Sequence, residues 1–361
     1  MKLGFFTMPM HPIGKDWQIS LREDREAFIL ADQLGFVEGY VGEHATDPEE
    51  NITSSALFLA TLVDATKQMK LGTGTLNLPN HHPVTLASHI AMLDHLLGGR
   101  FILGISPGAL PSDAEAYGNF DLPRPAMFLE SINQLLKIWT TEPPYNLKGE
   151  HWNISTERTY IAETGMGSIP KPLQRPHPPI VVTAVAPFSQ GITEAAARGW
   201  DPISANFLLP KWVKSHWTKY VEGCARAERE ADPANWRVAK TVFVAKDDAT
   251  AEAYALGTDG PYYYYYRSLF NKLKRRGSLG VFKSDPKMSD DSVTLEDVMK
   301  QLVIYGSPSK VADEIHALQE VTGQFGTMLY AGVDWTDREL ARDSMILMAE
   351  KVLPLVNVVN G

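Results

Sequence analysis

Short apolar runs alternate with longer segments of helical periodicity along almost the whole chain. Runs such as 2–7 are typical of buried strands, whereas apolar residues recur every three or four positions in segments such as 19–35. The pattern predicts strands at 2–7, 36–41, 69–79 (a strand and a turn), 100–106, 179–185, 201–206, 237–246 and 326–332. It predicts helices at 19–35, 54–66, 83–99, 126–140, 189–199, 211–231, 309–323 and 337–356.

This alternation predicts an α/β fold of the (β/α)8 TIM-barrel type. Strands that alternate with helices pair in parallel, because a parallel neighbour needs a crossover connection. Eight such units are the number that closes a barrel. The rival is an open doubly wound sheet, which usually has a glycine-rich phosphate turn after its first strand. Here that turn reads TMPMHPIG and lacks the G-x-G-x-x-G pattern, which favours the barrel.

Two stretches break the rhythm, at 141–178 and at 257–292. We interpret both as insertions in one domain that spans 1–361, since no repeat or linker marks a boundary. The second insertion contains five consecutive tyrosines (262–266) and the basic sequence KLKRRG, which we expect to be solvated. It is therefore a candidate active-site lid.

Composition narrows the function classes. The net charge of −9 does not favour a nucleic-acid surface, which needs clustered Lys and Arg. The single cysteine, Cys224, rules out a disulfide framework. The N-terminal sequence has no signal-peptide pattern, and no uninterrupted apolar stretch is long enough for a membrane span. We therefore expect a cytoplasmic protein that binds neither nucleic acid nor membrane.

The polar residues at the predicted strand ends are the candidate chemistry, because barrel active sites lie at the carboxyl ends of the strands. Neutral and apolar side chains dominate these ends, which suits a flat aromatic cofactor and an apolar substrate. The candidates are Thr7, Met8, His11, Glu43, His44, Thr75, Asn77, Asn80, His81, His82, Ser106, Thr183, Val185, Phe188, Ser189, Ser204, Asn206, Tyr330 and Asp334.

A metal site is one interpretation of the histidines. His44, His81, His82 and Glu43 could be ligands if they converge. However, the first strand end has no H-x-H pair, and the fourth, fifth and sixth have no carboxylate in position. We therefore expect no metal. The alternative for His81 and His82 is loop packing and helix capping, because Pro83 follows them at a helix start.

The turn after the fifth strand is a candidate anion site. It leads directly into a helix, whose first backbone N–H groups can bind a phosphate. Ser189 could cap this helix or donate its hydroxyl to the anion. Because no basic residue stands beside the turn, we expect backbone dipoles to hold the phosphate.

Several longer motifs resemble the bacterial luciferase-like flavin monooxygenases, and the resemblance covers nearly the whole chain. The motifs are LGTGTLNLPNHHPVTLASHIAMLDHLLGGRFILGISPG, PPIVVTAVAPFSQGITEAAARG and GSPSKVADEIHALQEVTGQFGTML. Within the family, GEHATDPEEN, the HHP turn and GPYYYYYRSLF are most similar to the limonene and diketocamphane monooxygenases.

The resemblance implies a luciferase-like barrel that binds FMN, usually as FMNH2 delivered by a separate NAD(P)H:flavin reductase. In this family O2 is the co-substrate: it adds at flavin C4a, and the peroxyflavin then oxygenates the substrate. A small apolar substrate, of cyclic or terpenoid type, is implied here, as is a homodimer.

The resemblance also assigns residues. His44 matches the catalytic histidine, with Ala45 where a second histidine is common. Thr75, after Gly74, matches a non-proline cis peptide under the flavin ring, and Ser106 matches the reactive cysteine of the luciferases.

Asn77 belongs with these cofactor-binding candidates at the third strand end. Pro107 replaces an arginine that faces the phosphate in luciferases, which leaves phosphate binding to Val185, Phe188 and Ser189. For this reason no light emission is expected.

Two alternatives remain. One is a deazaflavin (F420)-dependent hydride-transfer enzyme on the same barrel, whose anionic cofactor tail should be rimmed by Lys and Arg that these strand ends lack. The other is a non-catalytic flavin-binding relative, against which an intact His44 argues.

Overall fold

Eight parallel strands close into a barrel in the computed structural model, which describes residues 1–7 and 10–358. The strand β12 pairs with both β10 and β1, so the sheet has no gap between its last and first strands. The predicted (β/α)8 barrel is confirmed. In barrel order the strands are β1 (Lys2–Thr7), β2 (Glu38–Val41), β3 (Lys70–Thr73), β5 (Phe101–Ser106), β8 (Ile180–Ala184), β9 (Asp201–Ser204), β10 (Arg237–Val244) and β12 (Thr327–Gly332).

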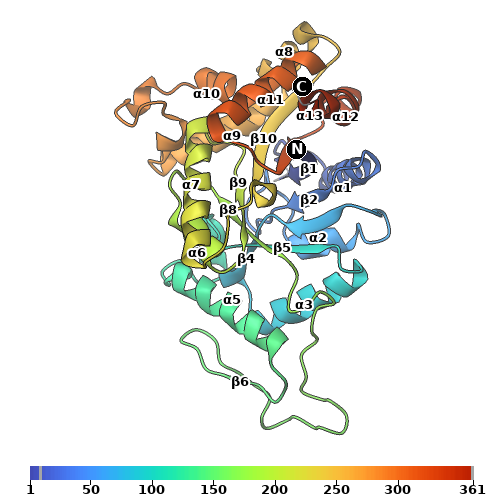
Figure 1. Cartoon of the computed structure of the whole chain (residues 1–361), viewed down its shortest axis with the longest axis vertical. Helices are drawn as coiled ribbons and strands as arrows, with labels where there is room; N and C mark the ends of the chain where they lie inside the picture. Colours follow the sequence, from blue (N-terminus) through green and yellow to red (C-terminus); the bar gives the residue numbers. More distant parts are fainter. Residues whose placement is uncertain (8–9, 359–361) are drawn as a thin grey trace.

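Helices surround this barrel (Figure 1), and the predicted ones all form, with shifted ends. The largest shift is at 54–66, where only the first part is helical. They are α1 (Trp17–Gln33), α2 (Ser55–Ala60), α3 (Pro83–Leu96), α5 (Arg124–Thr140), α6 (Gln190–Ala197), α7 (Pro210–Arg226), α11 (Pro308–Thr322) and α12 (Arg338–Leu347), which continues through a π-helical turn (Met348–Val352) into α13 (Leu353–Asn357). A further helix, α8 (Asp248–Leu256), follows β10.

The barrel interior is filled with side chains. The Tyr40 ring occupies the space where a Cβ on Gly72 would lie, only 2.5 Å from that position. At the amino ends of the strands, Arg237 forms a two-pronged ion pair with Glu38, with N–O distances of 2.6 and 3.0 Å. A functional site is therefore confined to the opposite end, the barrel mouth. The interior cluster consists of Phe6, Tyr40, Ile102, Val181, Ile203, Ala239, Leu329 and Ala331.

The segment 257–292 is more regular than the sequence pattern indicated. Residues Pro261–Arg275 form a helix, α9, followed by 3-10 helices at Leu279–Phe282 and Asp290–Ser292. The five tyrosines hid the helical period, because polar and apolar positions cannot be distinguished in an all-aromatic run. In the structure Tyr262, Tyr265 and Tyr266 are buried, which is the spacing of one helical face.

Other elements were also missed. Beyond 292 these are α10 (Leu295–Leu302) and β11 (Val303–Gly306), which pairs with the second half of β10. After β5 there is a short helix, α4 (Pro111–Ala116). The predicted strand 69–79 is divided into β3, β4 (Leu76–Asn77) and a 3-10 turn (Leu78–Asn80).

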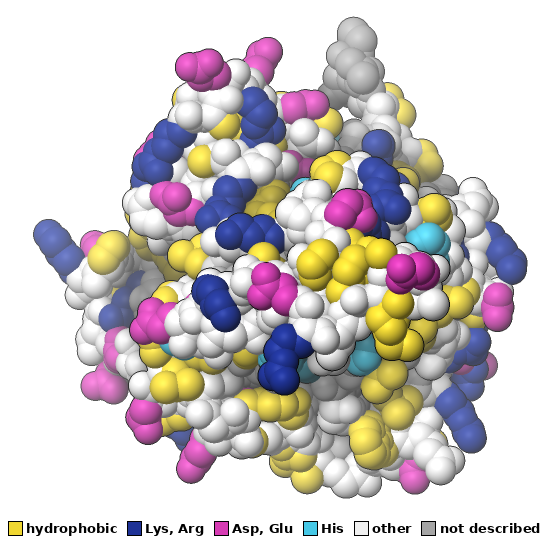
Figure 2. All heavy atoms as spheres, turned by 90° about the horizontal axis from the view of Figure 1, so that it is seen from below, with side chains coloured by type: hydrophobic (Ala, Val, Ile, Leu, Met, Phe, Trp, Pro, Cys, Tyr) yellow, Lys and Arg dark blue, Asp and Glu magenta, His cyan; other side chains and the backbone are white. Residues whose placement is uncertain are grey.

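The segment 141–178 contains a small hairpin, β6 (Asn146–Leu147) and β7 (Ile154–Ser155), which hangs below the barrel in Figure 1. Figure 2 shows the molecule from this end, where positive and negative side chains are interspersed with hydrophobic ones. Within the described residues, no helix combines the length and apolar character that crossing a bilayer requires.

Candidate active site

His44 follows β2 at the barrel mouth, and its ring is fixed by Asp113 of α4. The distance from His44 Nδ1 to Asp113 Oδ2 is 2.9 Å. Asp113 also accepts hydrogen bonds from the backbone N–H groups of Ala45 (3.1 Å) and Thr46 (2.9 Å), and from the Thr46 hydroxyl (2.7 Å). The other ring nitrogen, Nε2, lies 3.5 Å from Glu50 Oε2. Nε2 is therefore the nitrogen available for proton exchange.

The charges around His44 favour its protonated form. Burial opposes the positive charge, but the hydrogen bond that His44 donates to Asp113 and the nearby charge of Glu50 outweigh it and raise the pKa of His44. Burial likewise opposes the negative charge of Asp113, but its bonds with His44 and Thr46 lower the pKa of that carboxyl. Both pKa shifts favour a protonated His44 beside an ionised Asp113, so the two side chains form an ion pair when His44 carries its proton.

A chain of side-chain hydrogen bonds joins three of the predicted residues. The Thr75 hydroxyl donates to Ser106 Oγ (2.7 Å), and the Ser106 hydroxyl donates to Asn77 Oδ1 (2.9 Å). Ser106 Oγ also accepts from the N–H of Gly108 (3.0 Å). The peptide between Gly74 and Thr75 is cis, as the resemblance implied. Ser106 is thus held as a hydrogen-bonding group.

Glu43, the residue before His44, is hydrogen-bonded to Asn77 of this chain, and sequence reasoning gave it no such role. The Asn77 side chain donates to the Glu43 carbonyl (3.2 Å), and the Glu43 carboxylate accepts from the Asn77 N–H (3.1 Å) and the Ser55 hydroxyl (2.7 Å). Burial opposes the charge of this carboxylate, but its bonds with His81 and Ser55 outweigh that and lower its pKa. An ionised Glu43 therefore holds β2, the β3–β4 segment and α2 together.

The histidines considered as metal ligands each contact another protein group, His44 through Asp113. His81 Nε2 lies 3.4 Å from Glu43 Oε1, and His82 Nδ1 accepts from the N–H of Val84, which confirms the capping interpretation.

Within the described residues, the group that could hold a metal lies elsewhere: His11, Glu23 and Asp334. The ammonium of Lys15 lies 2.7 Å from Glu23 and 2.5 Å from Asp334, so these carboxylates already have a cation.

The predicted phosphate turn lies between β8 and α6. Phe188 has a positive φ of 53°, and its N–H donates to Ser215 Oγ (2.9 Å). Ser189 is the N-cap residue of α6, but its side chain makes no capping hydrogen bond within the described residues. Val185 and Phe188 are 48% and 58% exposed, although both are apolar.

The surroundings of this turn fit a bound group. The hydroxyl of Thr183 and the indole N–H of Trp212 are buried, and neither has a hydrogen-bond partner in the described part of the chain. The Trp212 ring packs edge-to-face on Phe188, with centroids 6.1 Å apart. Orphaned donors beside two exposed apolar side chains are what a flavin phosphate and ribityl chain could satisfy.

Arg124 is a cation that the sequence interpretation missed. It begins α5, and its guanidinium donates to the Pro107 carbonyl (2.6 Å) and to Asn119 and Asn80. The statement that the strand ends lack basic residues is therefore wrong for β5. Arg124 follows Pro107 by a whole intervening helix, so sequence spacing alone could not place it there.

The helix α9 lies over the β9–β10 side of the mouth. Asn206, after β9, exchanges hydrogen bonds with the Tyr265 hydroxyl (3.1 and 3.3 Å). The hydroxyls of Tyr266 and Thr241 lie 2.9 Å apart, and the Tyr262 hydroxyl donates to the Val242 carbonyl (3.0 Å). These bonds fix α9 to the barrel.

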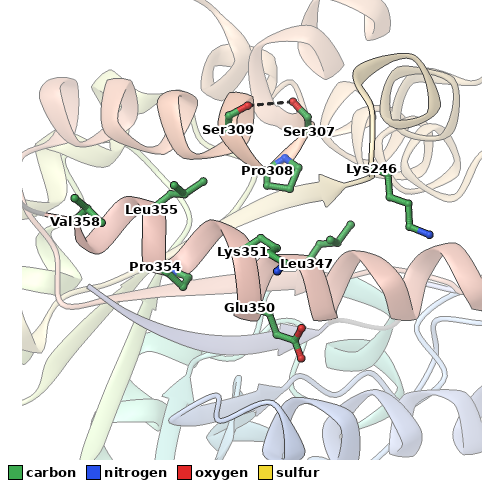
Figure 3. A pocket seen from close by; sticks show the side chains of 10 residues that line it. All are labelled: Lys246, Ser307, Pro308, Ser309, Leu347, Glu350, Lys351, Pro354, Leu355 and Val358. Atoms are coloured by element: carbon green, nitrogen blue, oxygen red, sulfur yellow. Dashed lines mark hydrogen bonds between the residues drawn. The ribbon is translucent and has the colours of Figure 1, made fainter.

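A groove of about 720 Å3 lies between the start of α11 and the α12–α13 segment (Figure 3). Lys246, Ser307 and Leu355 are among the residues that line it. Its lining includes none of the residues described above, so it is separate from the candidate site. Met8, a sequence candidate, lies outside the described residues.

Known proteins match the chain almost end to end. A family model described as luciferase-like monooxygenase matches residues 1–324. The chain is 32% identical over 364 residues to 4-hydroxyprotoasukamycin monooxygenase of Streptomyces nodosus subsp. asukaensis, covering 99% of this chain and 92% of that protein. It is 27% identical over 354 residues to limonene 1,2-monooxygenase of Rhodococcus erythropolis, covering 98% and 86%.

Among solved structures, the oxygenating constituent of 3,6-diketocamphane monooxygenase from Pseudomonas putida has a TM-score of 0.88 at 28% identity, covering 98% of both chains. That structure is described as a type II Baeyer–Villiger monooxygenase in complex with FMN. The motifs that resembled limonene and diketocamphane monooxygenases are thus matched by full-length relatives, and the chain is an enzyme that belongs to the luciferase-like monooxygenase family.

Proposed function

We propose that the protein is the oxygenase component of a two-component, FMNH2-dependent monooxygenase that acts on a small apolar substrate of cyclic or terpenoid type. One observation carries the proposal. His44, fixed by Asp113, directly follows Glu43 in the sequence, and Glu43 is hydrogen-bonded to Asn77 of the Thr75–Ser106–Asn77 chain.

The chain offers two regions to the flavin. Thr75, Asn77 and Ser106 would contact the ring, and Val185, Phe188 and Ser189 would surround the phosphate. Reduced FMN, when bound, supplies the electrons with which dioxygen is activated. The FMN complex of the diketocamphane relative supports this choice of cofactor.

His44 is the proton-handling group of the proposed site. Because Nδ1 is held by Asp113, Nε2, which lies 3.5 Å from Glu50 Oε2, is the nitrogen left to take or deliver a proton. The raised pKa keeps a protonated fraction at neutral pH, which general acid–base catalysis requires.

The residues above the mouth exclude water. We propose that 257–292 is a lid, with Tyr262, Tyr265 and Tyr266 of α9 as its buried face. An aromatic, largely apolar cover protects a reactive site from solvent and suits an apolar substrate. The names of the limonene and diketocamphane relatives support a substrate of this kind, since limonene is a cyclic hydrocarbon and a diketocamphane is a bicyclic hydrocarbon skeleton with two ketone groups.

Two partners complete the proposal. The phrase "oxygenating constituent" for the diketocamphane relative supports a separate NAD(P)H:flavin reductase. The family resemblance also leads us to propose a cytoplasmic homodimer. Sedimentation of the purified protein tests the dimer, and oxygenation with photochemically reduced FMN tests whether a reductase is needed only to supply FMNH2.

Anaerobic titration with FMNH2, reduced FAD and reduced F420, followed by admission of oxygen, tests the proposed function. We expect the tightest binding for FMNH2, and a transient absorbing species that matches neither oxidised nor reduced FMN. His44→Ala should bind FMNH2 and slow oxygenation by about 10²–10⁴-fold, the usual contribution of a general acid–base group. Tighter binding of FAD or F420, or an unchanged His44→Ala rate at saturating FMNH2, contradicts the proposal.

A further inference from the structure

Besides the face that packs on the barrel mouth, the helix α9 has a second face that contacts another part of the protein. Tyr264, Ser268 and Lys272 recur every four residues, so they lie in one row along the helix. This row faces residues 47–50, the segment that follows His44 in the sequence.

Every member of the row binds an acidic residue of that segment. The Tyr264 hydroxyl donates to Glu49 Oε1 (2.8 Å), and the Ser268 hydroxyl donates to the other Glu49 oxygen. The Lys272 ammonium contacts Asp47 (2.6 Å), Glu50 (3.2 Å) and Glu49 (3.4 Å). A single lysine thus contacts three carboxylates where α9 meets the loop after β2.

Glu50 stands between Lys272 and His44. Its Oε1 lies 3.2 Å from Lys272 Nζ, and its Oε2 lies 3.5 Å from His44 Nε2. Glu50 is buried, and Oε2 has no hydrogen-bond partner within residues 1–7 and 10–358. Lys272 and His44, which is cationic only when protonated, therefore share one buried carboxylate from different elements.

Few other charged groups of the described residues lie near the contact of Glu50 with Lys272 and His44. Asp113 faces the opposite nitrogen of His44, Asp47 adds to the negative potential at His44, and the Tyr265 hydroxyl lies near Glu50 and Lys272. Because Lys272 carries the same charge as a protonated His44, its presence disfavours that proton. By linkage, a proton on His44 weakens the docking of Lys272 by the same factor.

We propose that Lys272 is a positioning residue that couples docking of α9 to the protonation of His44, with Glu50 as the group between them. Neutral His44 favours docked α9, and protonated His44 favours its release. The inference rests on the proposed function only for the role of His44 in turnover. Its tests use neither flavin nor substrate, so its failure is distinguishable from failure of that function.

Titration of the histidine ring signals by NMR is the first test, with the His44 signal assigned by its loss in His44→Gln. Lys272→Met should move the His44 titration to higher pH, because the opposing cation is lost. Glu50→Gln should move it to lower pH, because the shared carboxylate is lost. If Lys272 and Glu50 had only a structural role, the two substitutions would move the His44 titration in the same direction.

Lys274→Met is the matched control, since Lys274 is exposed and lies two residues further along α9. It should leave the His44 titration unchanged, and Lys272→Arg should restore the wild-type titration. An unchanged His44 titration in Lys272→Met, or shifts of the same sign in Lys272→Met and Glu50→Gln, overturns the proposal.

Limited proteolysis within 257–292 is the second readout, because cleavage tracks the undocked population. In the wild-type protein, cleavage should accelerate as the pH falls through the His44 titration. Lys272→Met should be cleaved up to about fivefold faster at neutral pH, as expected for loss of a partly exposed ion pair. If Lys272→Met does not fold, the wild-type pH profile decides: cleavage that is flat across the His44 titration overturns the coupling.

Discussion

Replacing Asp113 by asparagine tests how much of the site depends on one carboxylate. Asp113 is 2% exposed and accepts hydrogen bonds from His44, Ala45 and Thr46. Asparagine keeps the shape but offers one acceptor oxygen, and its NH2 group would face groups that themselves donate. The perturbation therefore removes the charge beside His44 without opening a cavity.

The size of the expected effect on His44 follows from the hydrogen bond to Asp113 that is lost. A hydrogen bond to a charged group contributes about 1.5–3 kcal/mol, which corresponds to a factor of about 10–100. The pKa of His44 should therefore fall in Asp113→Asn, and proton-dependent turnover should slow by about the same factor. The stability that protonated His44 contributes is present at low pH and is lost as the pH rises through its raised folded-state pKa, so this loss should be smaller in the variant.

The assay combines NMR titration of His44 with product formation at saturating FMNH2. Glu115→Gln is the matched control, because Glu115 is an exposed carboxylate on the same helix, α4. It should change neither quantity. If His44 titrates identically in Asp113→Asn and in the wild-type protein, Asp113 does not stabilise the imidazolium, and our account of the site is wrong.

Three further predictions concern other parts of the molecule. Ser106→Ala should release more hydrogen peroxide and less product per FMNH2 consumed, since it removes a hydrogen bond worth roughly 0.5–1.5 kcal/mol, while Ser106→Cys should be tolerated. An unchanged ratio of product to FMNH2 in Ser106→Ala would place Ser106 away from the flavin. In thermal unfolding, Gly104→Ala should lower the free energy of unfolding by more than about 3 kcal/mol, because the new Cβ would lie 1.9 Å from the Thr73 carbonyl oxygen. Gly280→Ala is the control and should be nearly neutral, since its Cβ would have nothing within 4 Å. Burial alone would lower the pKa of His11, but the hydrogen bonds that its ring donates to two buried aspartates raise it to about 9. Unfolding by urea should therefore show a stability contribution that is full below pH 6.5 and declines as the pH rises through 9, and a His11→Gln variant with the same decline would refute this.

The barrel was predictable because its signal is local. Each strand, such as 2–7 or 326–332, is a short apolar run, and each neighbouring helix shows its own period. In a barrel of this type the active site lies at the carboxyl ends of the strands, so these ends could be listed from the sequence. This is why Thr75, Asn77 and Ser106, which the structure joins by hydrogen bonds, could be named in advance.

The missed parts depend on contacts between distant residues. Asp113 and His44 are 69 positions apart, and α4 is too short for its period to be recognised. Lys272 was expected on a solvated face, yet it pairs with acidic residues more than 200 positions earlier. Neither partnership leaves a pattern within a single segment.

The filled barrel interior has a consequence for the traffic of molecules. With Tyr40 packed against Gly72 and the Arg237–Glu38 pair across the far end, the axis offers no passage through the described core. Under the proposed function, flavin, substrate and product would then share one entrance, the barrel mouth over which α9 lies. A bulky flavin that enters first would leave room for a small apolar molecule above it, but the reverse sequence would block the flavin. Steady-state kinetics should accordingly follow a compulsory order, with the flavin as the first reactant to bind and the last to leave.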